Sequence, residues 1–212
     1  MQRLFPYDII APHLTAQREI QMKKMKGKLL MTAAEIDLVL ARISAEIVEK
    51  LGPRNEFAII GIRRRGVPLG ERLCKKIEAI LKRPIPFGIL DITLYRDDLT
   101  AISNRPMLRE TLIDFDINNL SLVLVDDVLY TGRTIRAALD GIVDLGRPRR
   151  VQLAVLIDRG SRELPIQADY VGKQVQVAED ETVEVRLTEE DQEERVLLLK
   201  KPPPSQSVEE NY

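Results

Sequence analysis

The residues best suited to chemistry in this chain are Asp126 and Asp127, an acidic pair that directly follows the apolar run at residues 122–125. Carboxylates accept hydrogen bonds from sugar hydroxyls and can help to hold the hydrated shell of Mg²⁺. A short polar loop follows, and its members are Thr131, Gly132, Arg133 and Thr134. Hydroxyl and guanidinium donors, beside a glycine that allows close backbone approach, suit a phosphate. The combination predicts a site for a phosphorylated ribose.

The surrounding pattern predicts the elements that position this site: a strand, a short loop and a helix. The run at residues 122–125 is apolar throughout, as is typical of a parallel strand covered on both faces. Apolar residues then recur at helical spacing: Ile135, Ala138, Leu139, Ile142 and Val143. Gly146 and Pro148 end this helix. The helix N-terminus presents N–H groups and a partial positive charge, which favour a bound phosphate.

Other phosphate-binding motifs do not fit this chain. A Gly-x-x-x-x-Gly-Lys-Ser/Thr loop is absent, and so is the Gly-x-Gly-x-x-Gly fingerprint of dinucleotide-binding proteins. A phosphoacceptor receiver domain needs a lone aspartate and a lysine on separate strand ends, and we do not see that layout. An ordinary α/β crossover with a polar strand end remains the plain alternative.

Three consecutive arginines, Arg63 to Arg65, form a second candidate site between a predicted strand at residues 57–62 and a helix that starts near Gly66. Because neighbouring like charges repel, the cluster needs an anion, and pyrophosphate offers fork-shaped acceptors. The alternative is a solvent-exposed basic turn. Cys74 follows the apolar helix positions Leu69 and Leu73, which predicts a small core residue rather than a nucleophile.

Composition limits the classes of protein that this chain can be. Its 212 residues are 44% hydrophobic and 31% charged, with a net charge of −1, as expected of a globular α/β domain. No apolar stretch approaches the ~20 residues that span a bilayer. One cysteine and one histidine exclude an intrachain disulfide, make a zinc site improbable and favour the cytoplasm. With this net charge, any contact with nucleic acid needs a local basic patch.

The chain divides into an N-terminal extension at residues 1–27, a domain at residues 28–200 and a disordered tail at residues 201–212. Thr32 and Glu35 form a capping box before a helix that Gly52 and Pro53 stop. Further strands are predicted at residues 87–94 and 151–157, and a closing hairpin at residues 183–187 and 195–199. The long segment at residues 95–119 suggests a lid.

The acidic pair and its loop resemble the phosphoribosyl-pyrophosphate (PRPP) motif of the type I phosphoribosyltransferases. Segments at residues 91–99, 156–165 and 168–173 resemble those of one family, the bifunctional pyrimidine operon regulatory protein and uracil phosphoribosyltransferase. The resemblance covers residues 31–199. It implies an α/β fold with a parallel sheet flanked by helices, a small hood and the C-terminal hairpin. It also implies transfer of phosphoribosyl from PRPP to uracil, giving UMP and pyrophosphate.

The resemblance also implies roles for individual residues. Residues that hold PRPP or UMP are Arg63, Arg64, Asp126, Asp127, Val128, Leu129, Tyr130, Thr131, Gly132, Arg133 and Thr134. The catalytic residues among them are Asp126, Asp127, Arg63 and Arg64, and Asp127 is the candidate for any proton abstraction. The lid contains Tyr95, Arg96 and Asp97, and the base pocket Arg159, Val175 and Val177. Mg²⁺ arrives with PRPP, without an all-protein metal site.

The family also binds pyrimidine-operon leader mRNA in response to UMP. Candidate RNA contacts are Arg42, Arg147, Arg149 and Arg150, for which a solvated turn or a subunit contact is the alternative. Ala41 and Ala45 stand where the family pattern has a threonine and a histidine on the RNA-facing surface. This departure weakens the case for RNA binding and leaves the active site untouched. Two alternatives stay open: a regulator with incidental catalysis, and a transferase for another base. A homo-oligomer, a dimer or larger, is expected, with no membrane partner.

Overall fold

The computed structural model describes residues 27–52, 56–96 and 111–201. Its main sheet has five parallel strands in the order β3-β2-β4-β5-β6. These strands are β2 (Phe57–Ile62), β3 (Phe87–Leu90), β4 (Ser121–Leu129), β5 (Arg150–Asp158) and β6 (Tyr170–Gln174). The predicted parallel sheet is therefore confirmed, and β4, which carries the acidic pair, lies at its centre.

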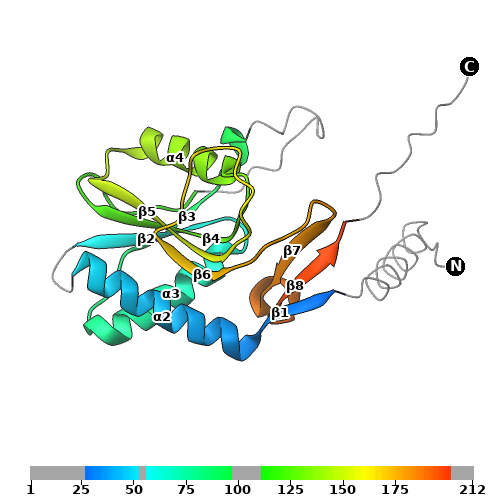
Figure 1. Ribbon diagram of the computed structural model, residues 1–212. Helices are drawn as coiled ribbons and strands as arrows, with labels where there is room; N and C mark the ends of the chain where they lie inside the picture. The colour runs from blue at the N-terminus through cyan, green and yellow to red at the C-terminus, as the bar shows by residue number, and fades with distance from the viewer. Residues whose placement is uncertain (1–26, 53–55, 97–110, 202–212) are drawn as a thin grey trace, which may run out of the picture.

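Helices cover both faces of this sheet (Figure 1). Helices α2 (Ala33–Leu51) and α3 (Gly66–Leu81) lie on one face, and α4 (Arg133–Leu145) lies on the other. Side chains alternate along β4 accordingly: Val123 and Val125 belong to the core under α2 and α3, whereas Leu122 and Leu124 belong to the core under α4. An all-apolar central strand is the pattern that two covered faces require.

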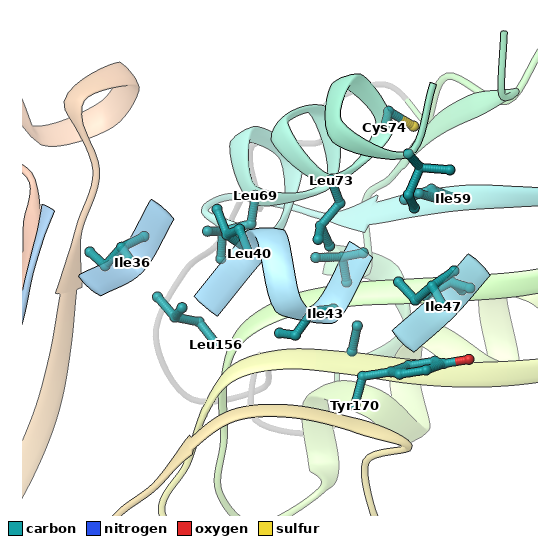
Figure 2. Close-up of a cluster of buried hydrophobic side chains, with 14 of the residues drawn as sticks. Ile36, Leu40, Ile43, Ile47, Ile59, Leu69, Leu73, Cys74, Leu156 and Tyr170 are labelled. Atoms are coloured by element: carbon teal, nitrogen blue, oxygen red, sulfur yellow. The ribbon is translucent and has the colours of Figure 1, made fainter. Parts of the chain in front are cut away.

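The core under α2 and α3 follows the helical spacing read from the sequence. Ile36, Leu40, Ile43 and Ile47 of α2 belong to this core, and Leu40, Ile43 and Ile47 lie close to α3 and the sheet (Figure 2). The capping box at Thr32 is present, and Gly52 caps the C-terminus of α2. Cys74 is buried in the same cluster, which confirms its assignment to the core.

A second, antiparallel sheet forms the hood, in the strand order β1-β8-β7. It comprises β1 (Lys28–Thr32), β7 (Glu181–Arg186) and β8 (Arg195–Lys200), with the short helix α5 (Thr188–Asp191) between the last two. The hairpin of β7 and β8 and the hood are thus confirmed. Strands β1 and β6 were not predicted. β1 pairs with residues more than 160 positions away, and local pattern does not reveal such partners.

Three local predictions were wrong. β3 ends at Leu90, not near residue 94, because the chain turns at Asp91 into the 3₁₀ helix η1 (Thr93–Tyr95); the Asp91 carboxylate accepts hydrogen bonds from the Thr93 N–H at 2.8 Å and from its hydroxyl. β4 does not end at the acidic pair but continues two residues beyond it, to Leu129. Val143 is 72% exposed, since Ala137 and Gly141 occupy the buried face of α4 instead.

Parts of the predicted domain organisation lie outside the residues that the structure describes. These include nearly all of the predicted extension and tail, and residues 97–110 of the predicted lid. None of the helices within the described ranges is long and apolar enough to cross a membrane.

Candidate active site

Asp126 and Asp127 lie near the C-terminal end of the central strand β4. Asp126 is buried and Asp127 is half-buried. Each carboxylate accepts a hydrogen bond from the next backbone N–H: Asp127 N to Asp126 Oδ1 at 2.9 Å, and Val128 N to Asp127 Oδ1 at 2.8 Å. These bonds fix both carboxylates on the strand. The carboxyl ends of parallel strands are also where ligands bind in open α/β sheets.

Burial raises the pKa of Asp126 well above its ordinary value, and the charge of Asp127 beside it acts in the same direction. Burial also raises the pKa of Asp127. The hydrogen bond from Val128 and the positive charge of Arg65 oppose that rise. The pair is therefore a desolvated negative centre that a cation, or a developing positive charge on a bound sugar, would stabilise.

The loop between β4 and α4 consists of residues 130–132, so Thr131 and Gly132 of the predicted phosphate loop lie in it, whereas Arg133 and Thr134 belong to the helix. Gly132 is the residue before α4 and has φ +93°, a conformation that favours glycine. The Thr131 hydroxyl oxygen accepts a hydrogen bond from the Arg133 N–H at 3.3 Å. Arg133 and Thr134 form the first turn of α4, so the loop leads directly into a helix N-terminus, as a phosphate site requires.

The segment at residues 159–166 packs against this loop and forms hydrogen bonds with its backbone. The Thr131 carbonyl accepts hydrogen bonds from the N–H groups of Glu163 and Leu164, each at 3.0 Å. A Cβ on Gly132 would lie 3.3 Å from Leu164 Cβ, so the segment also packs closely on the glycine. Arg133, expected to hold phosphate, forms an ion pair with Glu163 at 2.6 Å.

The three arginines at residues 63–65, here called the arginine loop, lie beside the acidic pair because β2 and β4 are neighbouring strands. Gly61 is in register with Val125, and Arg63 and Asp127 each follow two residues later. A Cβ on Gly66 would lie 2.3 Å from the Val125 carbonyl oxygen, so the start of α3 packs directly on β4. The Arg63–Arg64 peptide bond is cis. Arg64 is exposed at the same edge.

The guanidinium of Arg65 pairs with the Asp191 carboxylate of the hood at 2.7 Å. The interpretation that all three arginines need an external anion is therefore wrong for Arg65. Only Arg63 and Arg64 remain as candidates for pyrophosphate.

The residues predicted to form the base pocket lie near the ends of β5 and β6. Arg159 is buried, and its guanidinium lies 3.8 Å from the centre of the Tyr130 ring. A cavity of about 790 Å³ opens beside it. Its lining residues are Asp158, Gly160, Arg162, Leu164, Pro165, Ile166, Gln167, Gln174, Val175 and Gln176. Val175 thus lines this cavity, whereas Arg159 and Val177 are not among the residues that line it, and its role as a base pocket stays a prediction.

The lid residues are placed only in part. The Tyr95 hydroxyl donates to Asp144 Oδ2 at 2.9 Å, which holds η1 against α4. Arg96 is exposed, and Asp97 lies outside the described residues. The structure therefore places Tyr95 and Arg96, and the lid itself stays a prediction.

The candidate RNA contacts do not form one cluster. Arg42 lies on α2 and donates to the carbonyls of Val171 and Gly172 at 2.9 and 2.7 Å, so its guanidinium ties α2 to β6. Arg147, Arg149 and Arg150 are exposed together at the start of β5. Ala41 and Ala45 are exposed on α2.

Sequence reasoning missed three residues that organise this site: Asp158, Arg162 and Asp191. Arg162 pairs with Asp158 at 2.7 Å, and Arg65 pairs with Asp191. The first pair is spaced four residues apart, which a local reading could have tested. The second joins residues 126 positions apart, and no local sequence pattern predicts it.

Comparison with solved structures supports the fold. The hypoxanthine phosphoribosyltransferase of Staphylococcus aureus aligns over 86% of this chain and 96% of its own, with a TM-score of 0.62 and 18% sequence identity. The hypoxanthine phosphoribosyltransferase of Trypanosoma cruzi aligns over 83% of this chain and 97% of its own, with a TM-score of 0.61 and 20% identity. At this identity the likeness shows the fold alone.

Comparison of sequences is more specific. Residues 31–191 match the family model described as phosphoribosyl transferase domain. The bifunctional protein PyrR of Pelotomaculum thermopropionicum is 59% identical over 152 residues, which are 72% of this chain and 84% of that protein. PyrR of Thermus aquaticus is 55% identical over 162 residues, 76% of this chain and 90% of its own. The chain therefore belongs to the phosphoribosyl transferase domain family, within the branch of the bifunctional PyrR proteins.

Proposed function

We propose that the protein transfers the phosphoribosyl group of PRPP to uracil, forming UMP and pyrophosphate. The observation that carries this proposal is the juxtaposition at the end of β4. A buried acidic pair, a Thr/Gly loop that opens a helix, and an arginine loop on the neighbouring strand lie together. A phosphoribose with a pyrophosphate on C1 needs these three groups at once.

In this reaction the ribose C1 loses pyrophosphate and acquires oxocarbenium-like positive charge. Asp126 and Asp127 would accept hydrogen bonds from the ribose hydroxyls, and their negative charge would lie near the developing positive charge. Arg63 and Arg64 would bind the leaving pyrophosphate. The loop at residues 130–132, with Arg133 and Thr134, would hold the 5′-phosphate. Catalysis then comes mainly from positioning and charge, and Asp127 is the candidate for any proton abstraction from uracil.

We propose Mg²⁺ as the metal that accompanies PRPP. Within the described ranges, no group of three or more histidine, cysteine or acidic side chains could hold a metal ion alone. The ion would arrive with the substrate, and Asp126 and Asp127 would be the carboxylates nearest to its hydrated shell. When bound, Mg²⁺ would neutralise charge on the pyrophosphate.

The base would enter the cavity beside β5 and β6, between Val175 and the segment at residues 159–166. Arg159 and Val177 border this region in the proposal. The segment with Tyr95, Arg96 and Asp97 would close over PRPP and exclude water, because hydrolysis is the wasteful competitor of transfer.

A base-panel assay tests the transferase. The protein is incubated with PRPP, Mg²⁺ and, separately, uracil, orotate, hypoxanthine or guanine. We expect UMP and pyrophosphate in equal amounts from uracil. If the protein converts another base but not uracil, that base is the substrate instead of uracil. If it converts none of the four bases, the proposed reaction is refuted.

We also propose UMP-responsive binding of pyrimidine-operon leader mRNA as the second function. The supporting observation is the exposed basic group of Arg147, Arg149 and Arg150. The occupied donors of Arg42, together with Ala41 and Ala45, count against the surface of α2. Uridine nucleotides would act here as the signal, since UMP is also the product of the first activity.

Two further proposals concern the state of the protein. We propose a homo-oligomer, a dimer or larger, as the resemblance to the family implies; Leu94 and Val143, 71% and 72% exposed, are candidates for its contact surface. We place the protein in the cytoplasm, since its single cysteine is buried and unpaired. Light scattering during gel filtration tests the first of these, and cell fractionation tests the second.

A further inference from the structure

The guanidinium of Arg162 is bonded on every side within the described chain. Nε donates to the Ile166 carbonyl at 2.9 Å, and Nη2 donates to Asp158 Oδ2 at 2.7 Å. Nη1 lies 3.1 Å from the carbonyls of both Tyr130 and Gly160 and 3.5 Å from that of Leu129. The side chain is only 21% exposed. One residue therefore joins the end of β5, the segment at residues 159–166 and the predicted phosphate loop.

This bonding continues along the loop. The Leu129 carbonyl also accepts from the Arg159 N–H at 3.1 Å, and the Thr131 carbonyl accepts from Glu163 and Leu164, each at 3.0 Å. Three successive carbonyls, those of residues 129, 130 and 131, thus face the segment at residues 159–166.

A trans peptide unit is planar, and its N–H points away from its C=O. Carbonyls 129 to 131 belong to the same peptide units as the N–H groups of residues 130 to 132. Because these carbonyls are held on one side, the N–H groups of Tyr130, Thr131 and Gly132 are turned to the other. Successive N–H groups on one side of a loop form an anion-binding concavity.

The same segment also forms a wall of the cavity assigned to the base. Gly160, Arg162, Leu164 and Ile166 all line it. Arg162 therefore contacts both the backbone that would hold the 5′-phosphate and the wall against which the base would lie.

We infer that Arg162 is a positioning residue, which sets the N–H groups of residues 130–132 toward the 5′-phosphate and links this loop to the base cavity. The inference rests on the proposed transferase. Arg162 acts through backbone carbonyls and Asp158, not by touching the substrate. A lysine cannot replace it, because an ammonium carries its three donors on one atom, whereas the planar guanidinium carries five in a fixed fork.

The test compares Arg162→Lys with wild type by calorimetric titration with PRPP and Mg²⁺ in the absence of any base, and then by steady-state kinetics. We expect PRPP affinity to fall at least tenfold and the KM for PRPP to rise accordingly. The KM for uracil should rise as well, since the cavity wall moves with the loop. Asp158→Asn keeps an oxygen acceptor and should give a smaller loss of the same kind.

Arg186→Lys is the matched control. Arg186 is also a mostly buried arginine, 12% exposed, bonded to two carboxylates, those of Glu184 and Glu193, but it lies in the hood. It should lose stability without a comparable loss of PRPP affinity.

Unchanged PRPP affinity in folded Arg162→Lys, or an equal loss in Arg186→Lys, would overturn the positioning role. If Arg162→Lys does not fold, Asp158→Asn decides by the same two readouts. If the wild-type protein binds PRPP but uses another base, the positioning role of Arg162 still holds. Only the assignment of uracil as the substrate is then corrected. Wild type that binds no PRPP would overturn both.

Discussion

Arg65 and Asp191 form a two-point ion pair that joins the arginine loop to the hood. Nε of Arg65 donates to Asp191 Oδ2 at 3.0 Å, and Nη2 donates to Oδ1 at 2.7 Å. Asp191 Oδ2 also accepts the Leu187 N–H at 3.0 Å, which orients the carboxylate. Because the positive charge of Arg65 acts on Asp127 as well, the hood, the arginine loop and the acidic pair are electrostatically linked.

Asp191→Asn should loosen this link. Arg65 holds the pKa of Asp191 below its ordinary value, so the pair contributes stability above that ordinary value, and the contribution is lost as pH falls through the lowered pKa. We expect a loss of about 1 kcal/mol at pH 7, discounted for partial exposure, and no difference from wild type in strong acid. The KM for PRPP should rise a few-fold. Urea unfolding at several pH values and steady-state kinetics measure these effects.

Asp180→Asn provides the control for that prediction. Asp180 also lies in the hood and pairs with Lys200, but at 3.7 Å with both side chains largely exposed. It should change neither stability nor KM measurably. Equal behaviour of the two variants would mean that the Arg65–Asp191 pair does not position the site.

Asp126→Asn should make the protein more stable and less active. Burial raises the pKa of Asp126 in the folded state, so its ionised form destabilises the fold at neutral pH. An amide oxygen can still accept the Asp127 N–H. We expect about 1 kcal/mol of added stability at pH 7, or about 2–4 °C in Tm, together with loss of most UMP formation.

The pH dependence of this variant has a defined sign. A raised carboxyl pKa means that wild type loses stability as pH rises from the unfolded pKa, about 3.9, to the folded one. The advantage of Asp126→Asn should therefore be absent below about pH 4 and should grow as pH rises toward the raised pKa of Asp126. Calorimetric melting across this range measures it. A variant less stable than wild type at pH 7 would contradict the electrostatic description of the pair.

Gly132→Ala tests the phosphate loop. Gly132 has φ +93°, and an added Cβ would lie 3.3 and 3.4 Å from the Cβ atoms of Leu164 and Ile166. Left-handed strain costs about 1–2 kcal/mol, and overpacking adds about 1–3. We expect a total loss of about 2–5 kcal/mol in urea unfolding and at least a tenfold loss of PRPP affinity in calorimetric titration.

Gly160→Ala separates strain from crowding in the stability measurement. Gly160 has φ +70°, but nothing lies within 4 Å of an added Cβ. It should lose only the strain, about 1–2 kcal/mol. If both variants lose the same stability, the packing of residues 164 and 166 on the loop is not as close as the structure indicates.

The fold was largely predictable because its strongest signals are local. The apolar runs of β2 and β4 need two covered faces, and the four-residue spacing of Leu69, Leu73 and Ile77 marks α3. β1 and β6 escaped prediction because their pairing depends on distant segments. Val143 fits the helical spacing of α4, yet small residues of the same helix take the buried positions.

The sequence predicted the residues of the candidate site that could carry chemistry. It did not predict the residues that hold them in place. Asp126, Asp127 and the Thr/Gly loop occur together in the sequence, so pattern alone assembles them. Arg162 and Asp191 act by reaching backbone or charge contributed by other elements. Such partners become visible only when the sheet and the hood bring the segments together.

Charge reversal at Arg149 and Arg150 tests the RNA proposal. Both guanidinium groups reach the Ser121 hydroxyl, at 3.2 and 3.1 Å, and both residues are exposed at the start of β5. We expect the double change to glutamate to weaken binding of the leader RNA at least tenfold and to flatten its salt dependence. UMP formation should stay at the wild-type rate. Gel shifts with and without UMP, at two salt concentrations, measure the effect.

Lys75→Glu combined with Lys200→Glu is the matched control, since it reverses two exposed charges on other elements, α3 and β8. It should leave RNA binding near the wild-type level. Absent RNA binding by wild type would leave the transferase as the only function and would agree with the alanines at positions 41 and 45.

The most direct measurement is a crystal structure of the protein with PRPP and Mg²⁺. We expect the 5′-phosphate within about 2.7–3.2 Å of the N–H groups of Tyr130, Thr131 and Gly132, and the ribose hydroxyls at Asp126 and Asp127. Pyrophosphate should lie at Arg63 and Arg64. PRPP bound elsewhere at saturating concentration, with the turn between β4 and α4 empty, would contradict the assignment of this site.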